Sequence, residues 1–131
     1  MKKRILLVFT LIFILLAFTA CGKYTAHYSA VSYAHSNTDS SAFMSFWRFE
    51  GTEIFEMKCG RKGAELAYSG KLETGSLTVY CDCGGGKQEL FSLGAGDEIE
   101  SAVSLSEGKV TVIVETDGLC ETGELEFDIV G

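Results

Sequence analysis

The sequence predicts an all-β fold: a single antiparallel β-sandwich of about eight strands, or a small barrel of strands, over residues 42–131. Short segments in which apolar and polar residues alternate recur about every ten residues. Gly, Asp and Ser cluster between them, and these residues favour turns. Parallel strands need connections of about a dozen residues or more, and no gap between the segments is that long. A parallel α/β architecture is therefore disfavoured.

The chain begins with a segment typical of export. Three basic residues in Met1–Arg4 precede the apolar run Ile5–Phe18, and small residues then lead to Cys21. A transmembrane helix needs about 20 apolar residues, so this run is short for a membrane span. We interpret residues 1–20 as a helical signal peptide that is cut before Cys21.

The residues around the cut resemble the lipobox of bacterial lipoproteins. Thr19, Ala20, Cys21 and Gly22 conform to that pattern, whereas Phe18 stands where the family prefers Leu. The resemblance implies that the Cys21 thiol carries lipid, which would anchor the protein to the extracytoplasmic face of the cell membrane. The alternative is an ordinary signal peptide in which Cys21 has no special role.

Residues 21–41 are predicted to form the lipidated cysteine and a flexible tether. The segment is rich in Ser, Ala, Thr and Tyr and shows no sustained period of a strand or helix. It holds the only histidines of the chain, His27 and His35, with Asp39 as the one nearby carboxylate. Such a set makes a poor metal site, so we expect a solvated linker and no metal.

The sandwich strands follow the tether, and alternation is most regular in the last two. The eight predicted strands are residues 42–50, 52–59, 64–69, 76–83, 88–93, 98–105, 110–115 and 124–129. Turns are expected at residues 51, 60–63, 70–75, 84–86, 94–97, 106–108 and 116–123. The glycines of 84–86 precede a Lys but lack the spacing and the following helix of a phosphate loop, so a hairpin turn is the better interpretation.

The closing stretch resembles the last hairpin of many small exported bacterial β-sandwich domains. In it, Gly108 begins a strand that reaches Glu115, and Gly123 begins a partner that reaches Phe127. The resemblance supports the sandwich and implies that these two strands meet. Such domains are functionally diverse, so it assigns no activity.

Charge excludes one class of partner. Removing residues 1–20 takes away three of the 11 basic residues and none of the 18 acidic ones, which changes the net charge from -7 to -10. Nucleic acid is therefore not expected as a partner, because its phosphates need a basic face. Anionic lipid would also be repelled, so the acyl chains must supply the membrane attachment.

Four cysteines remain in the domain, and they are expected to form two disulfides. Cys59, Cys81 and Cys83 share strand faces with apolar residues, and Cys120 makes the set even. Export favours oxidation, and each bridge would stabilise the fold by roughly 2 to 4 kcal/mol. In an extended strand, the Cα atoms of Cys81 and Cys83 lie near the outer limit for a relaxed bridge. The geometry therefore favours Cys59 with one of that pair and Cys120 with the other.

Other uses of the cysteines are weaker. A zinc site would need four convergent thiolates, and the paired spacing of zinc knuckles is absent. A thiol-redox site at Cys81-Asp82-Cys83 is the second alternative, although only Lys87 is near enough to activate a thiolate. Buried free thiols are the third.

An enzyme is not expected. The domain has no histidine to act as a base, so no catalytic residue and no cofactor are assigned. Asp97, Glu98, Glu100 and Glu107 form the densest acidic group and could serve a glycosidase or bind calcium. Their placement on one strand and its turns is more typical of a solvated surface.

The most specific ligand hypothesis concerns Phe46 and Trp47. They lie in a predicted strand that is apolar on both faces, and an exposed aromatic patch marks a ligand or partner. Either ring could stack on a sugar; core packing is the alternative for both. The sequence thus predicts a membrane-anchored, non-catalytic binding or envelope-accessory module for a protein or glycan ligand. The alternatives are a calcium- or zinc-binding protein, a thiol-redox protein and a carbohydrate-binding module.

Overall fold

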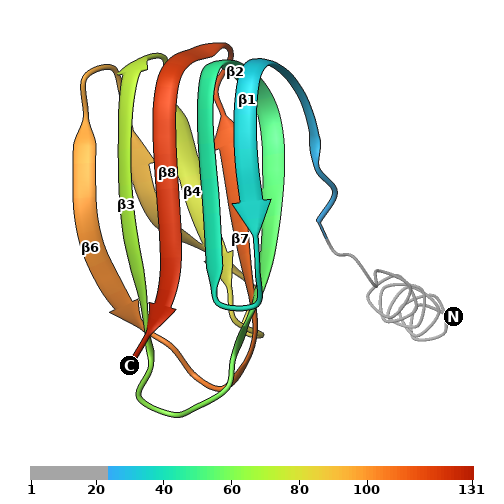
Figure 1. Ribbon diagram of the computed structural model, residues 1–131, viewed down its shortest axis with the longest axis vertical. Helices are drawn as coiled ribbons and strands as arrows, with labels where there is room; N and C mark the ends of the chain where they lie inside the picture. Colours follow the sequence, from blue (N-terminus) through green and yellow to red (C-terminus); the bar gives the residue numbers. More distant parts are fainter. Residues whose placement is uncertain (1–23) are drawn as a thin grey trace, which may run out of the picture.

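A computed structural model describes residues 24–131, which form eight β-strands and no helix (Figure 1). The strands are β1 (His27–Asn37), β2 (Ser41–Cys59), β3 (Glu65–Thr74), β4 (Leu77–Asp82), β5 (Lys87–Leu93), β6 (Glu98–Ser104), β7 (Gly108–Thr116) and β8 (Cys120–Val130). All their pairings are antiparallel. The predicted all-β antiparallel class is therefore confirmed. The expected signal helix and Cys21 lie outside the described residues.

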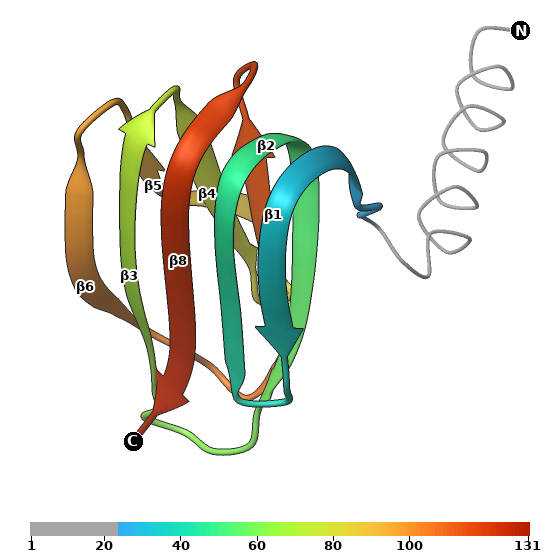
Figure 2. The ribbon, with the colours of Figure 1, turned by 45° about the horizontal axis from the view of Figure 1, so that its top comes forward.

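The strands belong to one sheet that folds over into two layers. The order is β5-β4-β7-β2-β8-β3-β6, and β1 also pairs with β2. The front layer contains β6, β3, β8, β1 and the first half of β2, while the back layer contains β5, β4, β7 and the second half of β2 (Figure 2). Within the described chain, no helix is long and apolar enough to cross a membrane.

The core fills the space between the layers. In β3, β4, β8 and each half of β2, buried residues alternate with more exposed ones, as the pleat of a strand requires. The largest fully buried side chains are Phe49, Phe55, Phe127, Met44, Leu66, Leu72, Leu77, Leu93, Ile113 and Leu125. The predicted alternation is borne out in β8, where Leu125 and Phe127 are fully buried. It is wrong for β7, where residues 110–114 are all buried.

The long strand β2 replaces two predicted strands. Residues 42–50 and 52–59 were expected to be separate, with a turn at Gly51, but they form one continuous strand of 19 residues. Phe49 pairs with Cys120 of β8, whereas Thr52 pairs with Glu115 of β7. Gly51 has φ of +132°, and a Cβ atom there would run into the backbone oxygen of His27. The glycine therefore supplies a bend between layers, and the expected turn is wrong.

The tether prediction is wrong for residues 27–37, which form β1. Their register runs from His27 opposite Thr52 to Asn37 opposite Ala42. The folded domain thus begins at His27, well before the predicted boundary at residue 42. Ser32 has φ of +49°, and the register with β2 is the same on either side of it. Tyr28 and Tyr33, five residues apart, both contact Phe49, so the alternation changes by one position between them and a period-2 search misses the strand.

Aromatic contacts attach β1 to the core. The ring of Tyr28 stacks on Phe49 at 4.9 Å between centroids, and the ring of Tyr33 meets Phe49 edge-on at 5.2 Å. The Tyr33 hydroxyl donates a hydrogen bond of 2.5 Å to Oε2 of the buried Glu53, and Oε1 accepts from the backbone N–H of Ile54. A buried carboxylate thus has both oxygens satisfied.

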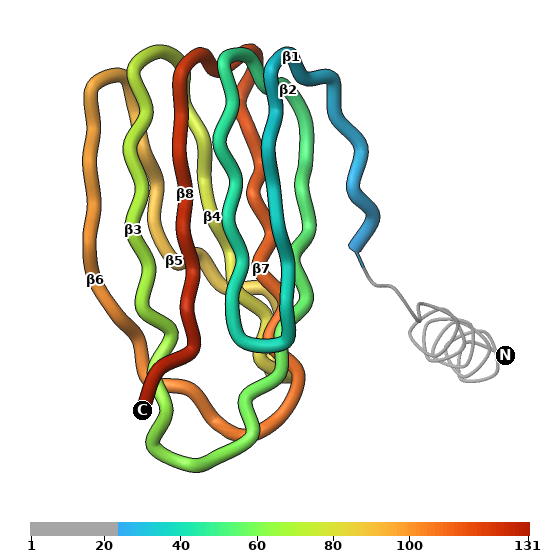
Figure 3. The backbone as a smooth tube through the Cα atoms, in the orientation of Figure 1, coloured from blue at the N-terminus to red at the C-terminus, as the bar shows by residue number. Residues whose placement is uncertain are grey.

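The expected final hairpin is also wrong. β7 and β8 are consecutive, but β2 lies between them in the sheet. β7 pairs with the second half of β2 in the back layer, and β8 pairs with the first half in the front layer. Figure 3 shows the connection at the end of the sandwich, with the C-terminus and the segment that precedes β1 on opposite sides of the molecule.

We predict that Gly51→Ala destabilises the full chain by about 1 to 3 kcal/mol, because an L side chain at this positive φ is strained and meets backbone. Urea denaturation measures the change. Gly60→Ala is the matched control, since Gly60 has open space around its Cα and an ordinary φ. Equal stability of the two variants would contradict the bend at Gly51.

We predict that Tyr33→Phe destabilises the protein by about 1.5 to 3 kcal/mol at neutral pH, because Glu53 loses a hydrogen bond to its charged form. Burial, and then the hydrogen bond to Glu53, raise the pKa of Tyr33 above its ordinary value of 10.0. The neutral phenol is therefore favoured in the folded state, and its stabilisation is present below pH 10 and is lost as pH rises through the folded pKa.

The pH dependence supplies a second readout for this contact. Urea unfolding at about pH 8 and about pH 11 should show a smaller alkaline loss of stability for Tyr33→Phe than for the wild type. Tyr28→Phe is the control, because the Tyr28 hydroxyl makes no hydrogen bond to a described residue and the ring stack remains. If Tyr33→Phe loses as much stability between the two pH values as the wild type does, Tyr33 does not contribute to the alkaline loss.

Candidate functional site

The outward side chains of the front layer form one continuous surface, which we call the outer face. On β2 these side chains are Phe43, Ser45 and Trp47. Across from Phe43 and Ser45, β8 presents Glu126 and Glu124. The lines of outward side chains continue across the sheet, because β8 pairs with β3 and β3 pairs with β6. The outer face therefore extends over the four strands β2, β8, β3 and β6.

A groove crosses the outer face above β3. Its floor consists of small residues, including Ala67 and Ser69, and Glu100 of β6 and Glu126 of β8 stand on either side of Ser69. The main part has a volume of about 670 Å³, and a neighbouring part of about 210 Å³ shares Ser69, Glu100 and Glu126 with it. Short side chains between longer ones are what hollow the surface here.

The groove is acidic. Its lining residues include the carboxylates Glu98, Glu100, Glu124, Glu126 and Asp128. Lys71 lies among them, and its Nζ is 3.7 Å from Glu124. No ion pair joins any of the other four to a described residue. The groove therefore favours cations and hydrogen-bond donors and repels anions.

Trp47 lies on the same face, one strand away from the groove. Its side chain is 49% exposed, and the guanidinium of Arg48 lies 4.7 Å from the ring centroid. Ser32 on β1 and Thr122 on β8 flank this position, and both have positive φ, +49° and +51°. The register of both neighbouring strands is the same on either side of this position, but the alternation of β2 is interrupted here, and Trp47 and Arg48 are both exposed.

Phe46 is not available to a ligand, and that part of the aromatic prediction is wrong. Its side chain is only 4% exposed and lies 5.4 Å from the Phe49 ring. The ring covers Gly123, where a Cβ atom would collide with it. Phe46 therefore packs in the core, the alternative that the sequence left open.

The four thiols are buried or half-buried, and all four are free. The expected inward position is borne out for Cys59 and Cys81, whereas Cys83 is half-buried in a turn. Cys120 is buried as well, but the expected pairing is wrong. Cys120 donates to the carbonyl of Ser76, which directly precedes β4 and is five residues before Cys81, so Cys120 is about 16 Å from Cys81 along the strand direction. Cys59 donates to the carbonyl of Arg61.

The pair ranked last by the sequence argument is the closest one. The sulfur atoms of Cys81 and Cys83 are 3.3 Å apart. The ranking assumed that both residues lie in an extended strand, but β4 ends at Asp82 and Cys83 already belongs to the following turn. Residues 84–86 complete that turn and Asp82 pairs with Lys87, so the predicted hairpin is confirmed.

The remaining predicted groups do not form a site. His35 stacks on Tyr33 at 4.8 Å, and His27 contacts the carbonyl of Thr25. Asp97 accepts the backbone N–H of Gly94 in a turn. Among the described residues, no three His, Cys, Asp or Glu side chains are placed to hold a metal ion.

Sequence reasoning missed most of the groove. Glu100 was assigned to an acidic group with Asp97, whereas its neighbours across the groove are Glu126 and Asp128, from the far end of the chain. The alternation of 124–129 does place these carboxylates on the polar side of a strand. The alternation does not show that β3 lies between β8 and β6 in the sheet.

Comparisons with known proteins find no matching family model and no matching curated protein. Solved structures give only distant likenesses. A protein from Neisseria meningitidis is 14% identical, with 76% of this chain and 87% of that chain covered and a TM-score of 0.38. TmCBM61, solved in complex with beta-1,4-galactotriose, is 12% identical, with 75% and 68% covered and a TM-score of 0.42. A cupin superfamily protein from Desulfitobacterium hafniense is 17% identical, with 82% and 79% covered and a TM-score of 0.35.

Proposed function

We propose that this protein is a lipid-anchored, non-catalytic binding module that binds a glycan without negative charge on the outer face. The observation that carries the proposal is the exposed Trp47 on the same face as an acidic groove with a floor of small side chains. An exposed tryptophan beside hydrogen-bonding groups is a surface suited to ligands with one apolar and one polar side.

The chemistry of the face selects the ligand. The indole of Trp47 offers a flat apolar surface for the C–H face of a sugar ring, and Arg48 restrains the indole through its cation–π contact. Glu100, Glu126 and Asp128 line the groove and accept hydrogen bonds from hydroxyl or amino groups. The same carboxylates repel sulfate or uronate groups, so neutral and amino-bearing glycans fit.

The anchor is proposed from the lipobox resemblance. A contact of the N-terminal segment supports a proposal for which side of the domain faces the membrane. Tyr24, three residues after Cys21, donates a hydrogen bond to Asp82 at the end of β4 in the back layer. Three residues reach at most about 11 Å. A lipid on Cys21 would therefore hold the back-layer side near the membrane and leave the outer face directed away from it, toward soluble or wall-borne ligands.

We predict that wild-type protein incorporates radiolabelled palmitate in bacterial cells and that Cys21→Ser abolishes the labelling, because the acyl chains require that thiol. Cys120→Ser is the control for loss of an unrelated cysteine, and it should label like the wild type. Equal labelling of Cys21→Ser and wild type would refute the anchor.

We predict that Trp47→Ala weakens binding to oligosaccharides at least about tenfold, because the stacking surface is lost. The measurement is a titration of the purified full chain with the neutral or amino-bearing oligosaccharide that binds best on a glycan array. Leu119→Ala is the control, since Leu119 is an exposed apolar residue, 44% accessible, in the turn before β8.

Two results of the glycan experiment would contradict the proposal. Absence of binding to every array glycan would remove the glycan as the ligand class. Undiminished binding by Trp47→Ala would move the site away from the outer face. Glu126→Gln tests the charge argument separately: it should leave neutral glycans bound and reduce the rejection of anionic ones.

A further inference from the structure

A pair of thiols lies away from the outer face, at an edge of the back layer. Cys81 belongs to β4 and is 9% exposed, while Cys83 is half-buried in the turn that follows. Their sulfur atoms are 3.3 Å apart, in hydrogen-bonding contact. Both line a cavity of about 310 Å³ between the β4–β5 hairpin and residues 103–106 at the end of β6. This volume is at the lower end of the range for small-ligand pockets.

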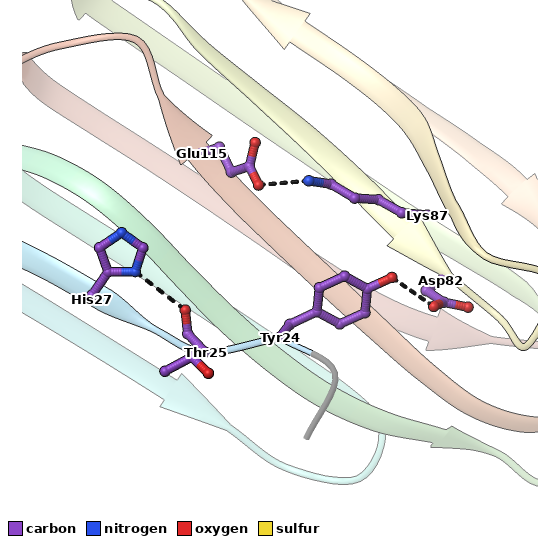
Figure 4. A network of polar contacts seen from close by, with 6 residues as sticks. All are labelled: Tyr24, Thr25, His27, Asp82, Lys87 and Glu115. Atoms are coloured by element: carbon purple, nitrogen blue, oxygen red, sulfur yellow. Dashed lines mark hydrogen bonds and ion pairs between the residues drawn. The ribbon is translucent and has the colours of Figure 1, made fainter. Parts of the chain in front are cut away.

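The carboxylate of Asp82 holds the turn that brings the thiols together. Its Oδ1 accepts hydrogen bonds from the backbone N–H groups of Gly84, at 2.9 Å, and Gly86, at 3.2 Å. Its Oδ2 accepts the hydroxyl hydrogen of Tyr24 at 2.7 Å (Figure 4). The chain therefore bends directly after Asp82, and the bend brings Cys83 back toward Cys81. If the strand continued, the two cysteines would be further apart.

The cavity wall contains a second irregularity. The register between β4 and β5 shifts between Val79 and Tyr80, so that Leu90 of β5 is an extra residue in the ladder. Leu90 lines the cavity beside the two cysteines. A bulge of this kind redirects a side chain, and here Leu90 lines the space next to the thiols while the pairing continues from Tyr80 to Asp82.

We propose that Cys81 and Cys83 form a dithiol–disulfide exchange site whose substrate is a disulfide, R–S–S–R, admitted by this cavity. Cys83 loses its proton and attacks one sulfur of the substrate, forming a mixed disulfide and releasing RS⁻, which takes up a proton. Cys81 then loses its proton and attacks Sγ of Cys83, which releases the second RS⁻. The two thiols lose two electrons and two protons in total, and the substrate gains them as two RSH.

The two cysteines differ in a way that assigns these roles. Cys83 is the more exposed thiol and is therefore the one that a substrate reaches. Burial, and then the hydrogen bond with Cys83, raise the pKa of Cys81 to about 12. Cys81 thus stays protonated at neutral pH while Cys83 attacks, and its sulfur lies 3.3 Å from the sulfur of Cys83, within reach for the second step.

The other two thiols lack this arrangement. Cys59 donates to the carbonyl of Arg61 and Cys120 to the carbonyl of Ser76, each at 3.2 Å. Neither has a second sulfur in hydrogen-bonding contact within the described chain. Cys59 and Cys120 therefore serve as internal controls for oxidation that is not specific to the Cys81–Cys83 pair.

Trypsin separates the cysteines cleanly. Cleavage after Lys71 and Lys87 gives a peptide of residues 72–87 that contains Cys81 and Cys83 alone, whereas Cys59 and Cys120 fall in other peptides. The experiment incubates the full chain with reduced and oxidised glutathione in defined ratios, quenches with acid, alkylates free thiols and measures the peptide masses. A chelator is present so that metal-catalysed oxidation does not contribute.

The expected result is that peptide 72–87 loses two hydrogens reversibly as the share of oxidised glutathione rises, while the Cys59 and Cys120 peptides remain alkylated. Asp82→Ala should lower the equilibrium constant for ring closure about tenfold, because the turn loses its acceptor. Asp82→Asn keeps Oδ1 as an acceptor and should close like the wild type. That rescue separates positioning from general destabilisation.

Three results would overturn the exchange site. Both cysteines of peptide 72–87 could remain alkylated under fully oxidised glutathione, or Cys83 could stop at a stable mixed disulfide with glutathione. Either cysteine could also be found linked to Cys59 or Cys120. Because the thiols lie outside the outer face, failure here leaves glycan binding by Trp47 unaffected, and loss of glycan binding leaves ring closure unaffected.

Discussion

The architecture depends on one strand that belongs to both layers. β2 pairs with β8 before Gly51 and with β7 after it, so the bend at this glycine determines how the sheet folds over. Everything else follows from that fold. The two ends of the sheet, β5 and β6, lie at the same side of the sandwich, where the cavity beside Cys81 is lined by residues from both edges. β1 covers the bend and is fixed there by Tyr33 and Glu53.

The local sequence pattern predicted where most strands lie but did not predict which strands pair with one another. Residues 110–114 of β7 are buried on both sides of the strand, whereas in 124–129 β8 has one buried side, and a period of 2 records only the second case directly. It cannot record that β2 separates these strands, because pairing between distant segments leaves no local pattern. The missed strand β1 has a different cause. Ser32 interrupts its period, and an edge strand with small polar residues on its outward side has a composition close to that of a linker.

The candidate site shows the same division. The aromatic run suggested Phe46 or Trp47 as a ligand contact, with core packing as the alternative for both. The structure separates them: Phe46 covers Gly123 in the core, while Trp47 is exposed beside Ser32 and Thr122, which both have positive φ. The acidic groove requires two strands, β6 and β8, that are adjacent to β3 and distant in sequence. For the thiols, an ideal extended geometry gave the wrong ranking because the side chain of Asp82 ends the strand between them.

A single carboxylate connects the N-terminal segment to the thiol pair. Asp82 accepts from Tyr24 through one oxygen and from the turn glycines through the other, so the segment leading to Cys21 and the turn carrying Cys83 share one group. Burial, followed by the hydrogen bond to Asp82, raises the pKa of Tyr24 to about 12, which keeps its hydroxyl protonated and donating at neutral pH. Tyr24 is therefore a hydrogen-bond donor at neutral pH, and the segment that follows Cys21 meets the turn that carries Cys83 at one carboxylate.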